Sequence, residues 1–93
     1  MENQATYTKK DIAKVVNYYS KIKVAELQIW DDISLGDEIL IQGSTTGSIN
    51  HTITSMEIDG VAIDYCKKGN NVAIAIDVKV RANDFVYKLI KRQ

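Results

Sequence analysis

Hydrophobic and polar positions alternate along most of this chain, which is the period of a β-strand whose two faces meet different surroundings. Residues 22–30 show the clearest alternation, between Ala25, Leu27 and Ile29 on one side and Glu26, Gln28 and Trp30 on the other. Residues 84–90 repeat the pattern, with Phe85, Tyr87 and Leu89 on one face. These segments are predicted to be half-buried strands.

The stretch LGDEILIQG, residues 35–43, predicts a short strand between two turns. Ile39 and Ile41 lie two positions apart, and Gly36 and Gly43 bracket them. Glycine adopts positive φ without a Cβ clash, so both glycines are interpreted as turn residues. Asp59-Gly60 is a favoured pair for a two-residue hairpin turn. A helix through either region would be interrupted.

Four further segments, residues 11–20, 48–58, 61–65 and 72–76, carry strand-like composition. Alternation is imperfect in the first, which predicts a twist or a bulge. In the second, one extra residue near Thr54-Ser55 would restore period two, and a β-bulge is expected there. Six or seven short strands without proline or a helical segment predict an all-β fold, a small closed antiparallel β-barrel.

The length of 93 residues suits one domain. Residues 1–8 are polar and without periodicity, so we expect a flexible leader at 1–8 and a single barrel domain at 9–93. No apolar run approaches the roughly 18 residues of a membrane-spanning helix. The N-terminal residues lack the apolar segment of a signal peptide, and one cysteine forms no internal disulfide. These features predict a cytoplasmic protein.

The net charge is zero, but the charges are segregated along the chain. Residues 1–23 hold five lysines and two carboxylates, and residues 67–93 hold seven basic and two acidic side chains. Residues 24–66 hold eight carboxylates and no lysine or arginine. If the first and last strands are neighbours, as in a closed barrel, the molecule has one basic and one acidic face.

Three ordered motifs carry a family resemblance: LGDEILIQG at 35–43, ITSMEI at 53–58 and KGNNVAI at 68–74. From Asp11 to Ile90 the chain resembles the second domain of translation elongation factors such as elongation factor Tu, a small closed β-barrel. Residues 18–21 and 80–88 are similar to two narrower groups. One is a set of small stand-alone elongation-factor-like proteins, and the other is the C-terminal barrel of collagenase-like peptidases, relatives of which modify RNA.

The departures from the translation-factor pattern limit what the resemblance implies. The chain has no phosphate-binding loop and no guanine-recognition motif, so GTP binding is not implied. The glycine usual near the start of the first strand is Ala13 here. Direct transfer of the factor's aminoacyl-tRNA contacts is therefore not implied either.

No set of residues in the sequence predicts catalysis or a metal site. Cys66 is interpreted as a core residue and His51, in a polar strand, as a solvent-facing one. The acidic residues Asp31, Asp32, Asp37 and Glu38 match no calcium loop. The Thr45-Thr46-Gly47 segment is interpreted as a polar connector. We therefore expect a non-enzymatic protein without catalytic, cofactor-binding or metal-binding residues.

The basic ends of the chain carry the clearest functional signal. Lysines can pair with phosphates while exposed tyrosine rings stack on bases. The competing interpretation is a solvated rim of lysines with tyrosines in the core. Combined with the resemblance, the pattern predicts an RNA-binding face made by Lys14, Tyr18, Tyr19, Lys21, Lys23, Lys88, Lys91 and Arg92.

Two functions follow as hypotheses. The first is a translation-factor-like barrel that binds tRNA or ribosomal RNA by electrostatic positioning, with no GTP and no membrane. The second is a protein-interaction or substrate-recognition module that acts with a separately encoded peptidase-like or RNA-modifying enzyme. In that case the acidic middle of the chain, or the tip around Trp30 and Ile33, would carry the contact.

Overall fold

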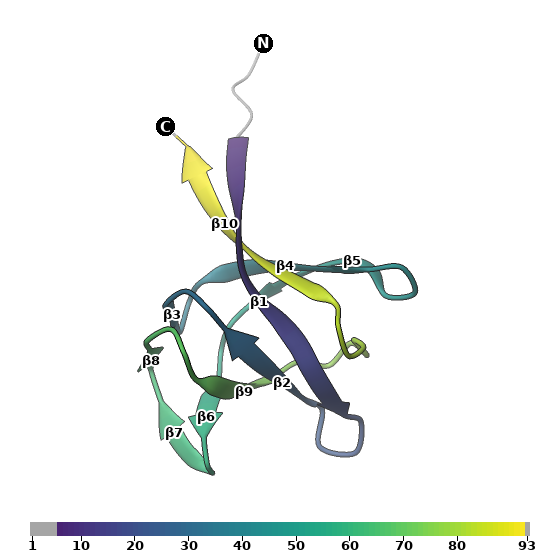
Figure 1. The fold of residues 1–93 in the computed structure, drawn as a ribbon, viewed down its shortest axis with the longest axis vertical. Helices are drawn as coiled ribbons and strands as arrows, with labels where there is room; N and C mark the ends of the chain where they lie inside the picture. The colour runs from purple at the N-terminus through teal and green to yellow at the C-terminus, as the bar shows by residue number, and fades with distance from the viewer. Residues whose placement is uncertain (1–5, 93) are drawn as a thin grey trace.

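Residues 6–92 are described by a computed structural model of the chain. They form ten β-strands (Figure 1): β1 (Thr6–Tyr19), β2 (Val24–Ile29), β3 (Ile33–Ser34), β4 (Glu38–Gly43), β5 (Gly47–Thr52), β6 (Met56–Ile58), β7 (Val61–Ile63), β8 (Tyr65–Cys66), β9 (Asn71–Ala75) and β10 (Phe85–Arg92). The described residues contain no helix long and apolar enough to cross a membrane. The predicted all-β class is confirmed, with ten strands among the described residues where six or seven were expected.

Eight strands make one curved sheet in the order β5-β4-β10-β1-β2-β9-β6-β7, and β3 pairs separately with β8. Every ladder between them is antiparallel. Within residues 6–92 no ladder joins the two end strands, β5 and β7. The antiparallel sheet is therefore confirmed, but the closed barrel is not.

The first and last long strands are neighbours at the centre of the sheet, which was the condition set for a shared basic face. β1 pairs with β10 from Thr6↔Arg92 to Lys14↔Phe85. β1 begins at Thr6, inside the segment predicted to be a leader, and residues 1–5 lie outside the described residues. Register shifts near Asp11 and again near Val15 confirm the irregularity expected from the imperfect alternation.

The core lies on the concave side of the sheet and follows the alternation along each strand. In β2 the buried residues are Ala25, Leu27 and Ile29. Ile39 and Ile41 of β4 are fully buried against them in the same cluster. Polar neighbours of these residues face outward, which is the expected outcome for a sheet with one dry face.

Two local predictions were wrong. Residues 48–58 are not one bulged strand, because the chain leaves β5 at Thr52 and enters β6 at Met56. Between them Ile53 is buried, and its amide and carbonyl bond to Asp37 and Gly36. Gly43 is not a positive-φ turn residue. It ends β4 beside Asp84, whose carboxylate occupies the space that a Cβ would need.

Two other turns are confirmed. Gly36 has a φ of 90°, and Asp59 and Gly60 have φ values of 51° and 80° between β6 and β7. Positive φ at both central residues is the type I′ pattern, whose twist matches that of the flanking strands. The turn chemistry of Asp59-Gly60 therefore specified this hairpin locally.

Candidate functional site

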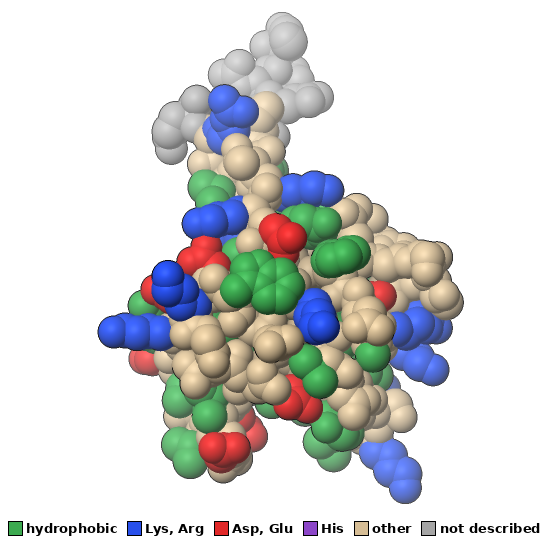
Figure 2. Space-filling view, in the orientation of Figure 1, with side chains coloured by type: hydrophobic (Ala, Val, Ile, Leu, Met, Phe, Trp, Pro, Cys, Tyr) green, Lys and Arg blue, Asp and Glu red, His purple; other side chains and the backbone are tan. Residues whose placement is uncertain are grey.

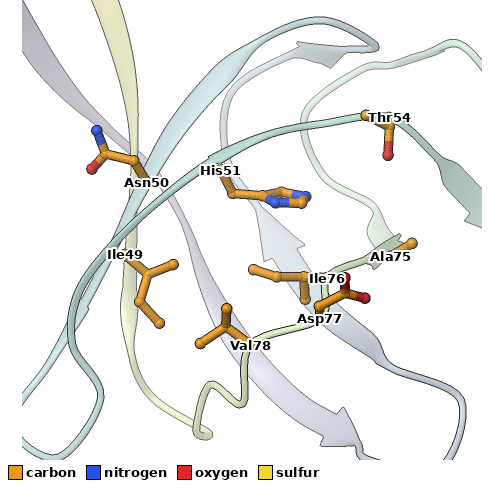
Figure 3. A pocket seen from close by; sticks show the side chains of 8 residues that line it. All are labelled: Ile49, Asn50, His51, Thr54, Ala75, Ile76, Asp77 and Val78. Atoms are coloured by element: carbon orange, nitrogen blue, oxygen red, sulfur yellow. The ribbon is translucent and has the colours of Figure 1, made fainter.

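A cavity lies between the end strand β5 and the chain segment that ends β9 and follows it. We call this place the seam, the space between β5 with its following loop and residues 75–78 after β9 (Figure 3). The cavity measures about 310 Å³. β5 contributes Ile49, Asn50 and His51, and Thr54 follows in the loop. The opposite wall is Ala75, Ile76, Asp77 and Val78.

His51 was predicted to face solvent, and the structure corrects this. It pairs with Ile39 in the β4–β5 ladder, so it shares the inner face with a fully buried residue. Its Nε2 atom is buried and has no hydrogen-bond partner among residues 6–92. The alternation of Ile49, His51 and Ile53 with polar residues was the sequence signal for this orientation.

The residues predicted to bind RNA do not gather in one place. Lys21 and Lys23 lie in the turn between β1 and β2, next to Tyr19. Lys91 and Arg92 lie at the other end of the β1–β10 pair, opposite Tyr7 and Thr6. Since a strand rises about 3.3 Å per residue, the length of β1 separates these two groups by roughly 40 Å. Figure 1 shows them at opposite ends of the molecule.

Two members of the predicted set are committed to internal contacts. Nζ of Lys88 donates to the Asp32 carbonyl at 2.9 Å and lies 3.3 Å from Oδ2 of Asp37. The hydroxyl of Tyr18 donates to the Ile76 carbonyl at 3.0 Å, and its ring packs on the core. The competing interpretation, tyrosine in the core, therefore describes Tyr18.

Lys14 belongs to a different surface, on the convex side of the sheet. It pairs with Phe85 of β10 on one side and with Gln28 of β2 on the other. Directly opposite residues of an antiparallel pair project from the same face, so these three side chains form a row. The indole of Trp30 reaches over the same strand, donating from Nε1 to the Asp11 carbonyl at 3.3 Å.

We call this surface the outer patch, defined by Lys14, Trp30, Phe85 and Tyr87. Trp30 is 43% exposed and Phe85 52% exposed, whereas Tyr87 is half-buried under Lys9, whose Nζ lies 4.5 Å from the ring centroid. Figure 2 shows hydrophobic and basic side chains together over β1, β2 and β10. The sequence alternation put Trp30 on the outer face of its strand, but it did not show that β10 buries Val86 and exposes Phe85. The register of β1 with both neighbours brings these rings together.

The acidic residues near β3 make hydrogen bonds and an ion pair with residues far away in the sequence. Asp32 accepts hydrogen bonds from the Tyr65 hydroxyl at 2.7 Å and the Lys68 amide at 2.9 Å, and the first of these lowers the pKa of its carboxyl. Asp31 pairs with Lys10 at 2.6 Å, which lowers its pKa likewise. Among residues 6–92 no three His, Cys, Asp or Glu side chains are grouped to hold a metal.

Cys66 and His51 do not form a nucleophile and base pair. Cys66 is buried at the β3–β8 pair, and burial raises the pKa of its thiol, which keeps it in the unreactive form. Within the described part of the chain no hydrogen bond joins His51 to a cysteine or serine. The assignment of Cys66 to the core is confirmed.

Comparison with known proteins identifies relatives that are much longer than this chain. No family model matches. The chain is 41% identical over 87 residues to an uncharacterized protease of Methanocaldococcus jannaschii, covering 94% of the chain and 21% of that protein. It is 33% identical over 90 residues to a collagenase of Porphyromonas gingivalis, covering 96% and 22%. The chain thus spans about a fifth of the length of these curated relatives.

Two crystal structures of the C-terminal domain of a putative U32 peptidase from Geobacillus thermoleovorans match the fold. One has a TM-score of 0.77 at 16% identity and covers 90% of this chain and 93% of that domain. Its selenomethionine variant has a TM-score of 0.79 and covers 83% and 96%. The chain has the fold of a U32 peptidase C-terminal domain. These matches support the resemblance to collagenase-like peptidases and do not support the one to translation elongation factors.

Proposed function

We propose that this chain is a non-catalytic recognition module that acts with a peptidase-like enzyme in the cytoplasm. The observation that carries the proposal is the extent of the matches. They cover 94–96% of this chain but only 21–22% of proteins named protease or collagenase. The same fold forms a separate C-terminal domain in a putative U32 peptidase. In this proposal the enzyme carries out the chemistry, and the module supplies recognition.

The outer patch is the surface that suits this role. Its Trp30 and Phe85 rings are exposed in the middle of the sheet, and aromatic side chains are enriched at interfaces, with tryptophan frequent among the residues that carry most of the binding energy. Trp30 is held in place by its bond to the Asp11 carbonyl, so little side-chain entropy is lost on contact. Apart from Trp30 itself, the acidic segment 24–66 contributes one aromatic ring, the exposed Tyr65.

The test is direct binding to a U32-type peptidase truncated before its own C-terminal domain, measured by calorimetry. Replacing Trp30 and Phe85 by alanine is expected to weaken binding by about 30-fold or more, which corresponds to about 2 kcal/mol for an aromatic hot spot. Val61→Ala is the matched control, since Val61 is 65% exposed on the distant β6–β7 hairpin. If the variant without Trp30 and Phe85 binds as tightly as the wild type and the Val61→Ala control, the proposal is overturned.

RNA binding is a second candidate function. The outer patch suits it better as a binding surface than the eight residues first predicted, because those residues do not lie together. The exposed Trp30 and Phe85 rings beside Lys14 match the combination of stacking and phosphate pairing found in single-strand binders. The experiment is fluorescence anisotropy of labelled total tRNA at low and near-physiological salt. Lys14→Glu with Trp30→Ala should abolish a salt-sensitive signal. A signal that survives both changes would place RNA elsewhere or show non-specific attraction.

A further inference from the structure

β5 ends the sheet without any of the devices that usually protect a strand edge. It pairs with β4 alone, in continuous register from Glu38↔Thr52 to Gly43↔Gly47. Its six residues include no lysine and no proline, and its ladder has no bulge. Natural sheets blunt exposed edges with such features because an open edge pairs with other strands. The far edge of β5 is therefore a template for an additional strand.

The opposite wall of the seam also has an unpaired side. β9 pairs with β2 as far as Val24↔Ala75, but with β6 only at Ile74 and Ala73. The Ile76 amide donates to the Lys23 carbonyl, which lies on the β2 side. In residues 6–92 no backbone hydrogen bond links residues 75–78 to β5. Among the described residues, the edge of β5 and the segment formed by the end of β9 and residues 76–78 thus line the seam without a backbone hydrogen bond between them.

The seam has room and surface for a strand. Its volume of about 310 Å³ equals roughly ten water molecules at about 30 Å³ each, enough for a backbone and one or two side chains. Figure 3 shows the side chains of Ile49 and Val78 pointing toward each other across this space, with His51 beside them. The unpartnered Nε2 of His51 supplies a polar contact, and Asp77 supplies the one formal charge among the lining residues.

We propose that the seam binds an extended peptide segment of a partner protein as an added β-strand. The peptide pairs its backbone with the free edge of β5 and places an apolar side chain between Ile49 and Val78. A polar group of the peptide satisfies His51, and a basic residue near the end of the inserted stretch pairs with Asp77. This goes beyond the proposed function, because the outer patch and the seam lie on different faces of the sheet.

The first experiment uses the isotopically labelled full chain and the acetylated, amidated hexapeptide KVTVKV, in which valines share one face. Binding is expected to raise amide protection against hydrogen exchange at least tenfold, and only in β5 and residues 75–78. The controls are two versions of the same peptide. In each version, alternate backbone nitrogens are methylated, so that the N–H donors of one edge of the strand are removed and those of the other edge are kept. These versions keep every side chain, but each removes one set of donors, and the version methylated toward β5 should bind at least tenfold more weakly.

Variants of the protein distinguish peptide binding in the seam from non-specific binding elsewhere on the surface. Val78 is 49% exposed, so Val78→Trp fills the seam without disturbing the core and should weaken peptide binding at least tenfold. Val61→Trp, at the other open edge, should change it less than twofold. Thermal unfolding of both variants checks that they fold. Equal binding by wild type and Val78→Trp would overturn the proposal.

Two further outcomes also decide against it. A library of hexapeptides with alternating apolar positions is tested at about 1 mM. If no peptide protects the amides of β5 against hydrogen exchange, the seam accepts no strand. Protection of β5 in the free protein, together with a dimer that Val78→Trp dissociates, would show that a second copy of the chain fills the seam. Neither result bears on the outer patch, so failure here leaves the proposed function to its own test.

Discussion

Replacing Gly43 by alanine should destabilise the protein, although alanine is ordinarily the better residue in a strand. An ideal Cβ at Gly43 would lie 1.9 Å from Oδ1 and 2.6 Å from Cγ of Asp84. Asp84 is only 6% exposed, and its other oxygen accepts hydrogen bonds from the Thr46 hydroxyl and the Arg81 amide. The new methyl group must displace this carboxylate and break both bonds.

The magnitude follows from those two bonds. Hydrogen bonds to charged groups contribute about 1.5–3 kcal/mol each, and partial rehydration of a displaced carboxylate recovers some of this. We expect Gly43→Ala to lower the free energy of unfolding by about 2–4 kcal/mol, against a gain of about 0.5–1 kcal/mol from replacing glycine in a strand. That is a large part of the roughly 5–14 kcal/mol expected for a chain of this length.

Urea denaturation followed by the fluorescence of Trp30, the single tryptophan, measures the effect. A double-mutant cycle with Asp84→Ala tests the cause. In the Asp84→Ala background the clash is gone, so Gly43→Ala should cost nothing or stabilise by about 0.4–1 kcal/mol. If the two substitutions add, or if Gly43→Ala alone costs under about 0.5 kcal/mol, the steric argument is refuted.

Three further predictions concern the contacts around β3. Because their folded-state pKa values lie below the ordinary 3.8, Asp31 and Asp32 stabilise the fold above that pH, and this contribution is lost as pH falls through the lower values. As the pH falls from about 5 to 2, the free energy of unfolding should therefore decrease less for Asp32→Asn than for the wild type. An equal decrease would contradict the lowered pKa of Asp32. Lys88→Met should lower the free energy of unfolding by about 1–2 kcal/mol in urea titrations, whereas the exposed Lys91→Met should change it by less than about 0.5 kcal/mol. The Cys66 thiol, buried and with a raised pKa, should react with a thiol reagent only at the rate of unfolding, and rapid labelling of native protein would show that it is accessible.

Strands and turns were predictable because their causes are local. The alternation of Ala25, Leu27 and Ile29 specifies which face of β2 is buried, and Asp59-Gly60 specifies a tight hairpin. The same locality explains the error at residues 48–58. An extra residue near Thr54 has the same effect on periodicity whether the strand bulges or ends, and only the destination of the chain distinguishes the two.

The candidate site was predicted less well, for a physical reason. The segregation of charge implied one basic face only on the condition that the first and last strands are neighbours, and β1 does pair with β10. It did not reveal that Lys88 turns inward to Asp37, or that the turn near Lys21 lies a full strand length from Arg92. The segregation of charge along the sequence shows which strands carry charged residues. A binding surface also depends on the distances between these side chains and on the directions in which they point.

The sequence by itself determined the all-β class, the buried faces of β2 and β4, the hairpin at Asp59-Gly60 and the burial of Cys66. The alternation of strand residues and the preferences of turn residues act over a few neighbouring positions, so they can be predicted from the sequence alone. The tertiary structure alone decided that Trp30, Lys14 and Phe85 share a row, that Gly43 must be small, and that the sheet stays open beside His51. These features arise from the register of strands far apart in the chain, and register is set by the packing of the whole sheet.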